Sequence, residues 1–372
     1  MRIFFKLAYI ITATILKKQM FNSIVQTFKQ SYVAIIIGII GGYLATLIHV
    51  PLPWLLGSLG LNLIFAFTKI NITFPQKLLN PIFLIIGIIL GGTFNVTLLY
   101  KIHLWIFSSI VMIITTVIST IIVSTYFYKV CKFKKIIAVL AGLPGAFVPI
   151  VSTIFHITAD KDSLSKVVIP QATRVILIVC FLPFFFVKQI GYAEINSFGF
   201  ESVFNIKYFA EIIFLILVCI AISLLFKKIK IPSSILIGSM AASGIFYTFE
   251  IIDSRFPDIF INLAFVLLGT ALGSRLNGLK LKELLFFGFH GSIITIILIG
   301  IAMFASFLLS KFFGFDFMSA FLSFAPGGIH EMVVISVAYN IDPIFVSYHH
   351  FLRIFIIVLL LPIILKKFGE KL

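Results

Sequence analysis

The sequence predicts an all-α polytopic membrane protein. Of its 372 residues, 61% are hydrophobic and only 11% are charged, whereas an ordinary soluble domain is about 25% charged. The mean hydropathy of +1.18 agrees, and a soluble globule this apolar would lack the polar residues to cover its surface. A disordered chain is excluded because such chains are poor in aromatic residues, and this one has 44 phenylalanines.

The membrane spans are expected to be helices. Apolar stretches such as 31–50 and 105–123 show no alternation of apolar and polar residues, whereas the strands of a membrane barrel alternate. Most apolar segments have lengths that match a bilayer, and longer ones can tilt. About 10–12 transmembrane helices are predicted, from segments near 31–49, 51–68, 79–100, 104–128, 136–158, 166–187, 206–226, 231–249, 257–275, 284–313, 317–340 and 344–365.

The net charge of +16 is expected to serve membrane anchoring. Most lysines and arginines lie between apolar segments, where they bias topology and face anionic lipid. No polar stretch is long enough to fold into a soluble DNA-binding domain, so direct binding of nucleic acid is not expected. The expected partners are the lipid bilayer and a small solute or ion. Whether the protein forms homo-oligomers is left open. A cytoplasmic N-terminus is favoured by Lys17, Lys18 and Lys29. Residues 1–30 form a short basic and apolar segment in which either Met1 or Met20 could be the start.

The chain carries the pattern of an internal duplication. The segment Pro51–Ser58 is matched by Pro232–Ser239, which pairs Gly57 with Gly238 at an offset of 181 residues. Further matches at offsets of 179 to 182 pair Gly87 with Gly269, Gly91 with Gly273, Pro144-Gly145 with Pro326-Gly327, Asp160 with Asp342, Arg174 with Arg353, and Pro183 with Pro362. Ordered matches of this kind indicate repeats. Two membrane copies are predicted, at 31–188 and 206–366, with a polar linker at 189–205 and a basic tail at 367–372.

The relative orientation of the two copies is left open by the sequence. Six segments in each copy would make the copies parallel. The basic loops partly favour an inverted second copy, because the first copy has a basic loop at 129–135 whereas its equivalent in the second copy holds little beyond Lys311. Repeat halves of either kind are common in secondary transporters.

Two Pro-Gly breaks lie inside apolar segments at matching positions of the copies. Proline removes a helical hydrogen bond and glycine adds backbone freedom, so both segments should open at membrane depth. Unwound backbone there must line a cavity or be buried in protein, and its free N–H groups can bind ions or anionic groups. The residues concerned are Pro144, Gly145 and Pro149 in the first copy, and Pro326, Gly327 and Gly328 in the second.

Ionisable residues lie in the same apolar segments. Glu331 follows the second break, Arg174 lies inside the apolar stretch 167–187, and Arg353 lies inside the apolar stretch 345–365. A charge at a helix centre costs about 2.5–3.5 kcal/mol on insertion scales, so each should face water or a partner. The pairs considered are Glu331–Arg353, Asp160–Arg174 and Asp342–Arg353. Two interpretations remain open: ion pairs that hold the halves together, or an anion site with Glu331 as a proton-coupling carboxylate.

Three histidines lie near this region. His330, His349 and His350 could relay protons near neutral pH, although the latter two could equally cap a helix or reach the interface. His330-Glu331 is not a zinc-peptidase motif, since the second histidine of H-E-x-x-H is missing. No nucleophile–base set, Walker loop or Cys/His metal set is present, so no enzyme activity, cofactor or metal is expected.

These motifs resemble the bacterial AbrB family of membrane proteins, also labelled AbrB-duplication or ammonia monooxygenase-related proteins. The matching residues are Pro51-Leu-Pro-Trp-Leu-Leu-Gly57, Leu143-Pro-Gly145, Gln171-Ala-Thr-Arg174, Ile231–Gly238, Ala325-Pro-Gly-Gly-Ile-His-Glu-Met332, Asn340-Ile-Asp342 and His349-His-Phe-Leu-Arg353. The resemblance implies a multi-pass protein of the bacterial cytoplasmic (plasma) membrane, built from two tandem copies and described as a transporter or as a regulator of gene expression. The first copy lacks the second glycine and the Glu-Met pair, so any carboxylate role rests on Glu331 alone.

A secondary transporter is therefore the favoured function. It would bind a small anionic or zwitterionic solute at the two broken helices, with arginines attracting the solute and Glu331 coupling to protons. The alternative is a membrane-embedded regulator or sensor that affects gene expression through ligand or partner binding.

Overall fold

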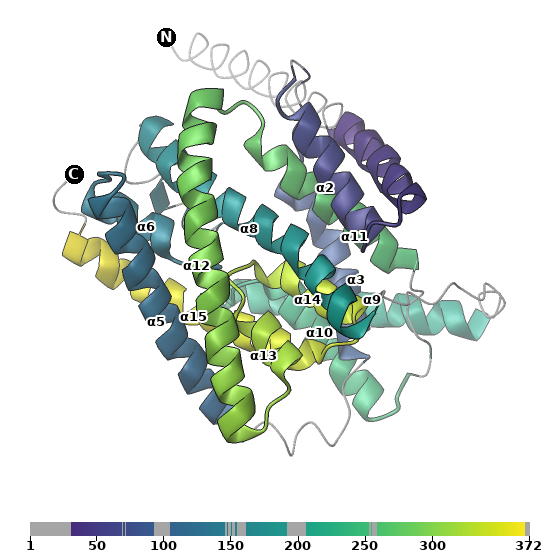
Figure 1. Ribbon diagram of the computed structural model, residues 1–372. Helices are drawn as coiled ribbons and strands as arrows, with labels where there is room; N and C mark the ends of the chain where they lie inside the picture. Colours follow the sequence, from purple (N-terminus) through teal and green to yellow (C-terminus); the bar gives the residue numbers. More distant parts are fainter. Residues whose placement is uncertain are drawn as a thin grey trace, which may run out of the picture.

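Every regular element in the described part of the chain is a helix (Figure 1). The computed structural model describes residues 31–68, 70, 72–92, 105–145, 147, 150, 153–154, 161–191, 206–252, 254 and 259–368. The predicted class of an all-α polytopic membrane protein is confirmed. The predicted segment 1–30 and most of the linker 189–205 lie outside the described residues.

The helices follow the predicted segments in order. The first half contains a helix at Ser31–Leu47, α2 (Pro53–Phe65), the 3-10 turn η1 (Gln76–Leu79), α3 (Asn80–Gly91), α5 (Trp105–Lys129), α6 (Lys135–Gly142) and α8 (Lys161–Ile190). The second half contains α9 (Ile206–Lys228), α10 (Ser234–Thr248), α11 (Ile259–Gly273), the 3-10 turn η4 (Ser274–Leu276), α12 (Leu281–Phe313), α13 (Phe317–Phe324), α14 (Ile329–Ala338) and α15 (Pro343–Phe368).

Several helices are shorter than the sequence predicts. Among the described residues, five helices are long and apolar enough to cross a membrane, namely α5, α8, α9, α12 and α15. By contrast, α2 has 13 residues and α3 has 12, or roughly 20 Å at 1.5 Å per residue. For α2, the proline at its first position sets the start at residue 53, two residues after the predicted one. For α3, the start agrees with the prediction, and residues 93–100 of the predicted segment lie outside the described part of the chain.

Glycines bring helices of the two halves into close contact. The pairs α2–α11 and α3–α10 make the most extensive helix contacts. Gly269 and Gly273 of α11 lie directly against the backbone of α2, and Gly87 and Gly91 of α3 lie against α10. A Cβ atom at any of these positions would meet backbone atoms. The close approach therefore requires glycine, as small residues commonly allow in membrane helix pairs.

Gly91→Ala should destabilise the protein, whereas Gly300→Ala should not. A Cβ at Gly91 meets the Gly244 backbone nitrogen and Ser243 of α10, while a Cβ at Gly300 of α12 meets nothing within 4 Å. Overpacking costs about 1–3 kcal/mol, and alanine gains up to about 1 kcal/mol over glycine in an open helix position. Apparent melting temperatures in detergent should therefore fall for Gly91→Ala and hold or rise for Gly300→Ala; equal shifts would contradict the packing argument.

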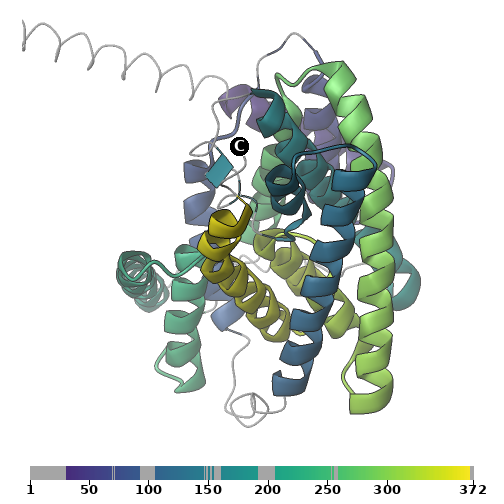
Figure 2. The same ribbon diagram turned by 90° about the vertical axis from the view of Figure 1, so that its left-hand side faces the viewer.

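The helices α5 and α12 run antiparallel to each other (Figure 2). The start of α5 meets the end of α12, where the rings of Phe107 and Phe313 stack with centroids 5.4 Å apart. The end of α5 meets the start of α12, where Tyr126 Oη lies 2.7 Å from His290 Nδ1. Both helices are long enough to span, so together they define the two ends of the molecule.

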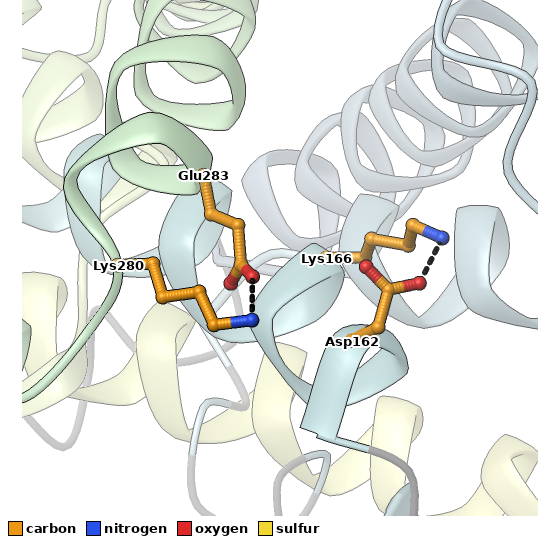
Figure 3. Close-up of polar contacts among 4 residues, drawn as sticks. All are labelled: Asp162, Lys166, Lys280 and Glu283. Carbon is orange, nitrogen blue, oxygen red and sulfur yellow. Dashed lines mark hydrogen bonds and ion pairs between the residues drawn. The ribbon is translucent and has the colours of Figure 1, made fainter.

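One of these ends is rich in lysine, and we call it the basic end. It carries the exposed or part-exposed residues Lys129, Lys132, Lys134, Lys135, Lys280 and Lys282. Two local ion pairs also lie there, Lys280–Glu283 and Lys166–Asp162 (Figure 3). Such exposed pairs contribute little to stability. Their presence marks a surface in contact with water.

Candidate functional site

The first break is held by two side chains of α8. Helix α6 ends at Gly142, Leu143 is extended, and Gly145 has a φ of +78°. Gln171 Nε2 donates to the Leu140 carbonyl at 2.7 Å, and Arg174 Nη2 donates to the Leu143 carbonyl at 3.1 Å. The last carbonyls of a helix have no partner within it. The predicted break is therefore present, and α8 stabilises it.

The second break is held in the same way by α15. Helix α13 ends at Phe324, and α14 starts anew after Gly328. Arg353 donates to the Ala325 carbonyl at 3.0 Å and to the Gly327 carbonyl at 3.1 Å. His350 Nε2 donates to the Leu322 carbonyl at 3.0 Å, so its Nδ1 accepts from Arg353 at 2.5 Å. His350 is thus neutral in this arrangement.

Three of the alternatives considered for this region are excluded. Neither His349 nor His350 reaches the interface, since both are fully buried; His350 instead caps the last turn of α13, and His349 bonds the Phe345 carbonyl and Ser108 Oγ of α5. Asp342 does not pair with Arg353, because its carboxylate accepts from the backbone N–H groups of residues 344 and 345 at the start of α15. The third alternative concerns Glu331, which does not pair with Arg353 either.

Glu331 instead forms an ion pair with Arg275. The atoms Arg275 Nη2 and Glu331 Oε1 are 3.3 Å apart, and the carboxylate side chain is 5% exposed against 21% for the arginine. Arg275 follows α11 in the turn η4, and its guanidinium lies over the ring of Phe147 at 4.9 Å. Arg275 is not among the site residues that the sequence predicts, so its role here was missed by the sequence analysis.

A cavity of about 300 Å³ lies where both breaks meet. It is bordered by α3, α8, α10, η4 and α14, which meet near the middle of the molecule (Figure 1). Its walls combine apolar side chains with a few convergent polar groups, as is typical of small-molecule sites. The lining residues are Asn80, Phe83, Gly145, Phe147, Gln171, Arg174, Val175, Pro232, Ser233, Ser234, Ile235, Leu236, Arg275, Gly328, Ile329, His330, Glu331 and Ile354.

The charged groups around this cavity are unbalanced. Among the described lining residues, two guanidinium groups, Arg174 and Arg275, face one carboxylate, Glu331. Arg353 adds a third positive charge directly behind Gly145. Arg174 is 3% exposed and its Nε has no hydrogen-bond partner, and neither has Oε1 of the buried Gln171. An excess of buried positive charge with a free donor favours a bound anion.

The N-terminus of α14 also opens into this cavity. Gly328 caps the helix without a side-chain partner, and residues 328–331 line the cavity. The Glu331 carboxylate folds back against Gly328, so that a negative charge lies at the positive end of the helix dipole. His330 stacks on Phe83 of α3, with ring centroids 3.7 Å apart.

The predicted site residues thus fall into three groups. The structure brings together Gly145, Gln171, Arg174, Gly328, His330 and Glu331 at the cavity, while Pro144, Pro326, Gly327, His350 and Arg353 lie at the breaks themselves. Asp342 and His349 lie elsewhere. Pro149 and Asp160 lie outside the described residues, as does the predicted pair Asp160–Arg174. Within the described ranges, no group of three His, Cys, Asp or Glu residues could hold a metal ion.

Residues 54–369 match the family model described as "Transition state regulatory protein AbrB". The chain belongs to the AbrB family. Both breaks, the cavity-lining arginines and Glu331 all lie inside this AbrB match. A relative from Bacillus subtilis (strain 168), the "Uncharacterized protein YhjN", is 24% identical over 343 residues, which cover 87% of this chain and 88% of the relative.

Proposed function

We propose that the protein is a secondary transporter that binds a small anionic solute in the cavity between the two breaks. The observation that carries the proposal is the charge of the cavity, where Arg174 and Arg275 face Glu331 alone. A cavity of about 300 Å³ is of the size that holds a small ligand. Broken helices at membrane depth are the usual place of such sites in transporters.

The anion would be held by three kinds of donor. Arg174 offers its free Nε, the start of α14 offers backbone N–H groups, and Arg275 offers a guanidinium near the opening. Arginine binds carboxylates and phosphates through two parallel hydrogen bonds. The site therefore favours planar or tetrahedral oxyanions over neutral solutes.

Glu331 would couple anion binding to protons. Its carboxylate lies against the start of α14 and pairs with the Arg275 guanidinium. A bound anion would need the same two groups, so the carboxylate competes with it. Protonation of Glu331 removes this competing charge and releases Arg275 for the solute. A proton and an anion would then enter the site together.

Arg275→Gln should lose most of the anion affinity, and it should also lower the melting temperature without anion, because the buried Glu331 carboxylate loses its partner. Removing a charged group that binds an anion costs about 2–5 kcal/mol in binding, or roughly 30-fold or more in the dissociation constant. The purified protein would be screened by thermal shift against phosphate, sulfate, acetate, succinate and glycine at two pH values. An anion at about a hundred times its dissociation constant adds roughly 2.7 kcal/mol.

Lys311→Gln is the matched control, because Lys311 is an exposed charge at the other end of α12. It should bind as the wild type does. Equal affinity in Arg275→Gln, or a preference for glycine over every anion, would contradict an anion site at this cavity.

A regulatory role is the second candidate, favoured by the description of the matching family as a transition state regulatory protein. In that case the cavity would bind its anion as a signal. Binding without any flux of that anion into liposomes containing the purified protein would favour the regulator over the transporter.

A further inference from the structure

The two halves share unusual backbone conformations at equivalent positions. Leu52 before α2 and Ser233 before α10 are both left-handed, with φ of 46° and 52°. His49 and Lys230 form a second left-handed pair at the same offset of 181 residues. Non-glycine residues rarely adopt this conformation. The helices α6 and α13, each of eight residues, also start at equivalent positions, so the correspondence extends to the first part of both breaks.

Contacts between the halves occur in exchanged pairs. Gly87 of α3 lies against Leu236 and Ser239 of α10, and its counterpart Gly269 of α11 lies against Leu55 and Ser58 of α2, which are the counterparts of those residues. The hydrogen bonds within each half correspond as well. Arg174 donates to the carbonyl of residue 143, and its counterpart Arg353 donates to the carbonyl of residue 325, which is the counterpart of residue 143. An exchange of partners is what a two-fold axis between two copies produces.

The orientation of α5 and α12 decides the direction of this axis. They are counterparts, both are long enough to span, and they cross antiparallel through the contacts Phe107–Phe313 and Tyr126–His290. Two counterparts that span in opposite directions are related by an axis in the membrane plane. This is the relation of inverted-repeat transporters, in which one repeat moves against the other.

We propose that the two halves are inverted repeats that exchange conformations, and that Arg353 forms the anion site of the state open to the opposite end. This inference rests on the proposed transport function. In the present state the cavity opens beside Arg275, its most exposed charged residue. Arg275 comes shortly before Lys280 and Lys282 of the basic end in the sequence, so we place the opening on that side. Exchange would close that opening and open its counterpart at the far end.

The counterpart site shares part of the chemistry of the open cavity, although no arginine or carboxylate stands at the positions equivalent to Arg275 and Glu331. Asn262 matches Asn80 of the open cavity, and Arg353 matches Arg174. The atoms Asn262 Oδ1 and Arg353 Nε both lack hydrogen-bond partners. Two spaces border Arg353, of about 10 and 140 Å³, and neither is lined by Asn262 or by residues 51–55, which are counterparts of residues around the open cavity. Buried polar groups without partners are expected of a site that binds its ligand only in another state.

Cysteine labelling tests the exchange without any substrate. In a chain whose Cys131, Cys180 and Cys219 are replaced by alanine, Ser233→Cys reports the open cavity and Leu52→Cys reports its closed counterpart. Leu59→Cys is the control, because Leu59 of α2 is as buried as Leu52 just before that helix, at 2% and 3% exposure respectively. Each variant is treated with a membrane-impermeant maleimide in vesicles of both orientations.

We expect Ser233→Cys to react from the basic end and Leu52→Cys to react only from the opposite end. If the second state is populated at about 1–10%, Leu52→Cys should react at about 1–10% of the rate of an exposed thiol, and Leu59→Cys far more slowly. Reaction of Leu52→Cys from the basic end, or at the rate of Leu59→Cys from both ends, overturns the exchange. If Leu52→Cys does not fold, Asn262→Cys carries the same test against Asn80→Cys.

The labelling result is independent of the anion screen. If the two cysteines are labelled from opposite ends but the protein binds no anion, the proposed exchange is supported and the proposed anionic solute is refuted. If the protein binds an anion but both cysteines are labelled from the same end, the proposed anion site is supported and the proposed exchange is refuted.

Discussion

Glu331→Gln should bind the anion equally well at all pH values and should lose uptake driven by a proton gradient. In the wild type, anion affinity should rise as the pH falls, because protonation removes the charge that competes for Arg275 and the start of α14. Glutamine is isosteric with the protonated acid. The variant should therefore bind as the protonated wild type does, whatever the pH.

The charged and titratable groups facing Glu331 set the conditions of this test. Arg275 pairs with it directly, Arg174 lies across the cavity, and His330 is its neighbour on α14. A pH dependence that came from His330 would persist in Glu331→Gln and vanish in His330→Gln. The measurements are the anion dissociation constant against pH and anion uptake into liposomes with and without a proton gradient. Uphill uptake retained in Glu331→Gln would refute the coupling role.

Arg353→Gln should give the largest loss of stability of any substitution at the breaks. Arg353 satisfies the carbonyls of Ala325 and Gly327 and donates to His350. An unsatisfied buried carbonyl costs about 1–3 kcal/mol, so two of them should cost roughly 2–6 kcal/mol. We expect a strong fall of the apparent melting temperature in detergent and a loss of monodisperse protein.

His350→Gln is the matched control, and the first half supplies the reason. Gln171, the counterpart of His350, donates to Leu140 just as His350 donates to Leu322. Glutamine can therefore replace the histidine bond, and the melting temperature should change little. A loss as large as that of Arg353→Gln would show that the neutral histidine, rather than the carbonyl contacts of Arg353, holds the second break.

The breaks were predictable from sequence, and the ion pair was not. Proline and glycine act on the backbone of their own segment, so Pro144-Gly145 and Pro326-Gly327 were sufficient to place both openings. Glu331 could be expected to need a partner, but the choice among Arg174, Arg275 and Arg353 depends on tertiary packing. Arg275 lies 56 residues away in sequence, and nothing local distinguishes it from the lysines that follow.

The bounds of α2 and the cavity residue Asn80 were also missed by the sequence analysis. Hydropathy does not separate a helix from an apolar turn beside it, so the predicted segment 51–68 is longer than α2 at both ends. Asn80 carried a usable signal, since an asparagine recurs at 262 within an otherwise apolar segment. That recurrence, at the offset of the other matches, would have marked Asn80 as a candidate for the site.

The glycine contacts have a consequence for how this chain folds. Each close pair, α2 with α11 and α3 with α10, takes one helix from each half, and the largest buried core extends from Leu52 to Ile354 through both. Neither half can cover its own glycine faces. The halves are therefore interleaved subunits of one folding unit, and the first becomes complete only after the second has been inserted beside it.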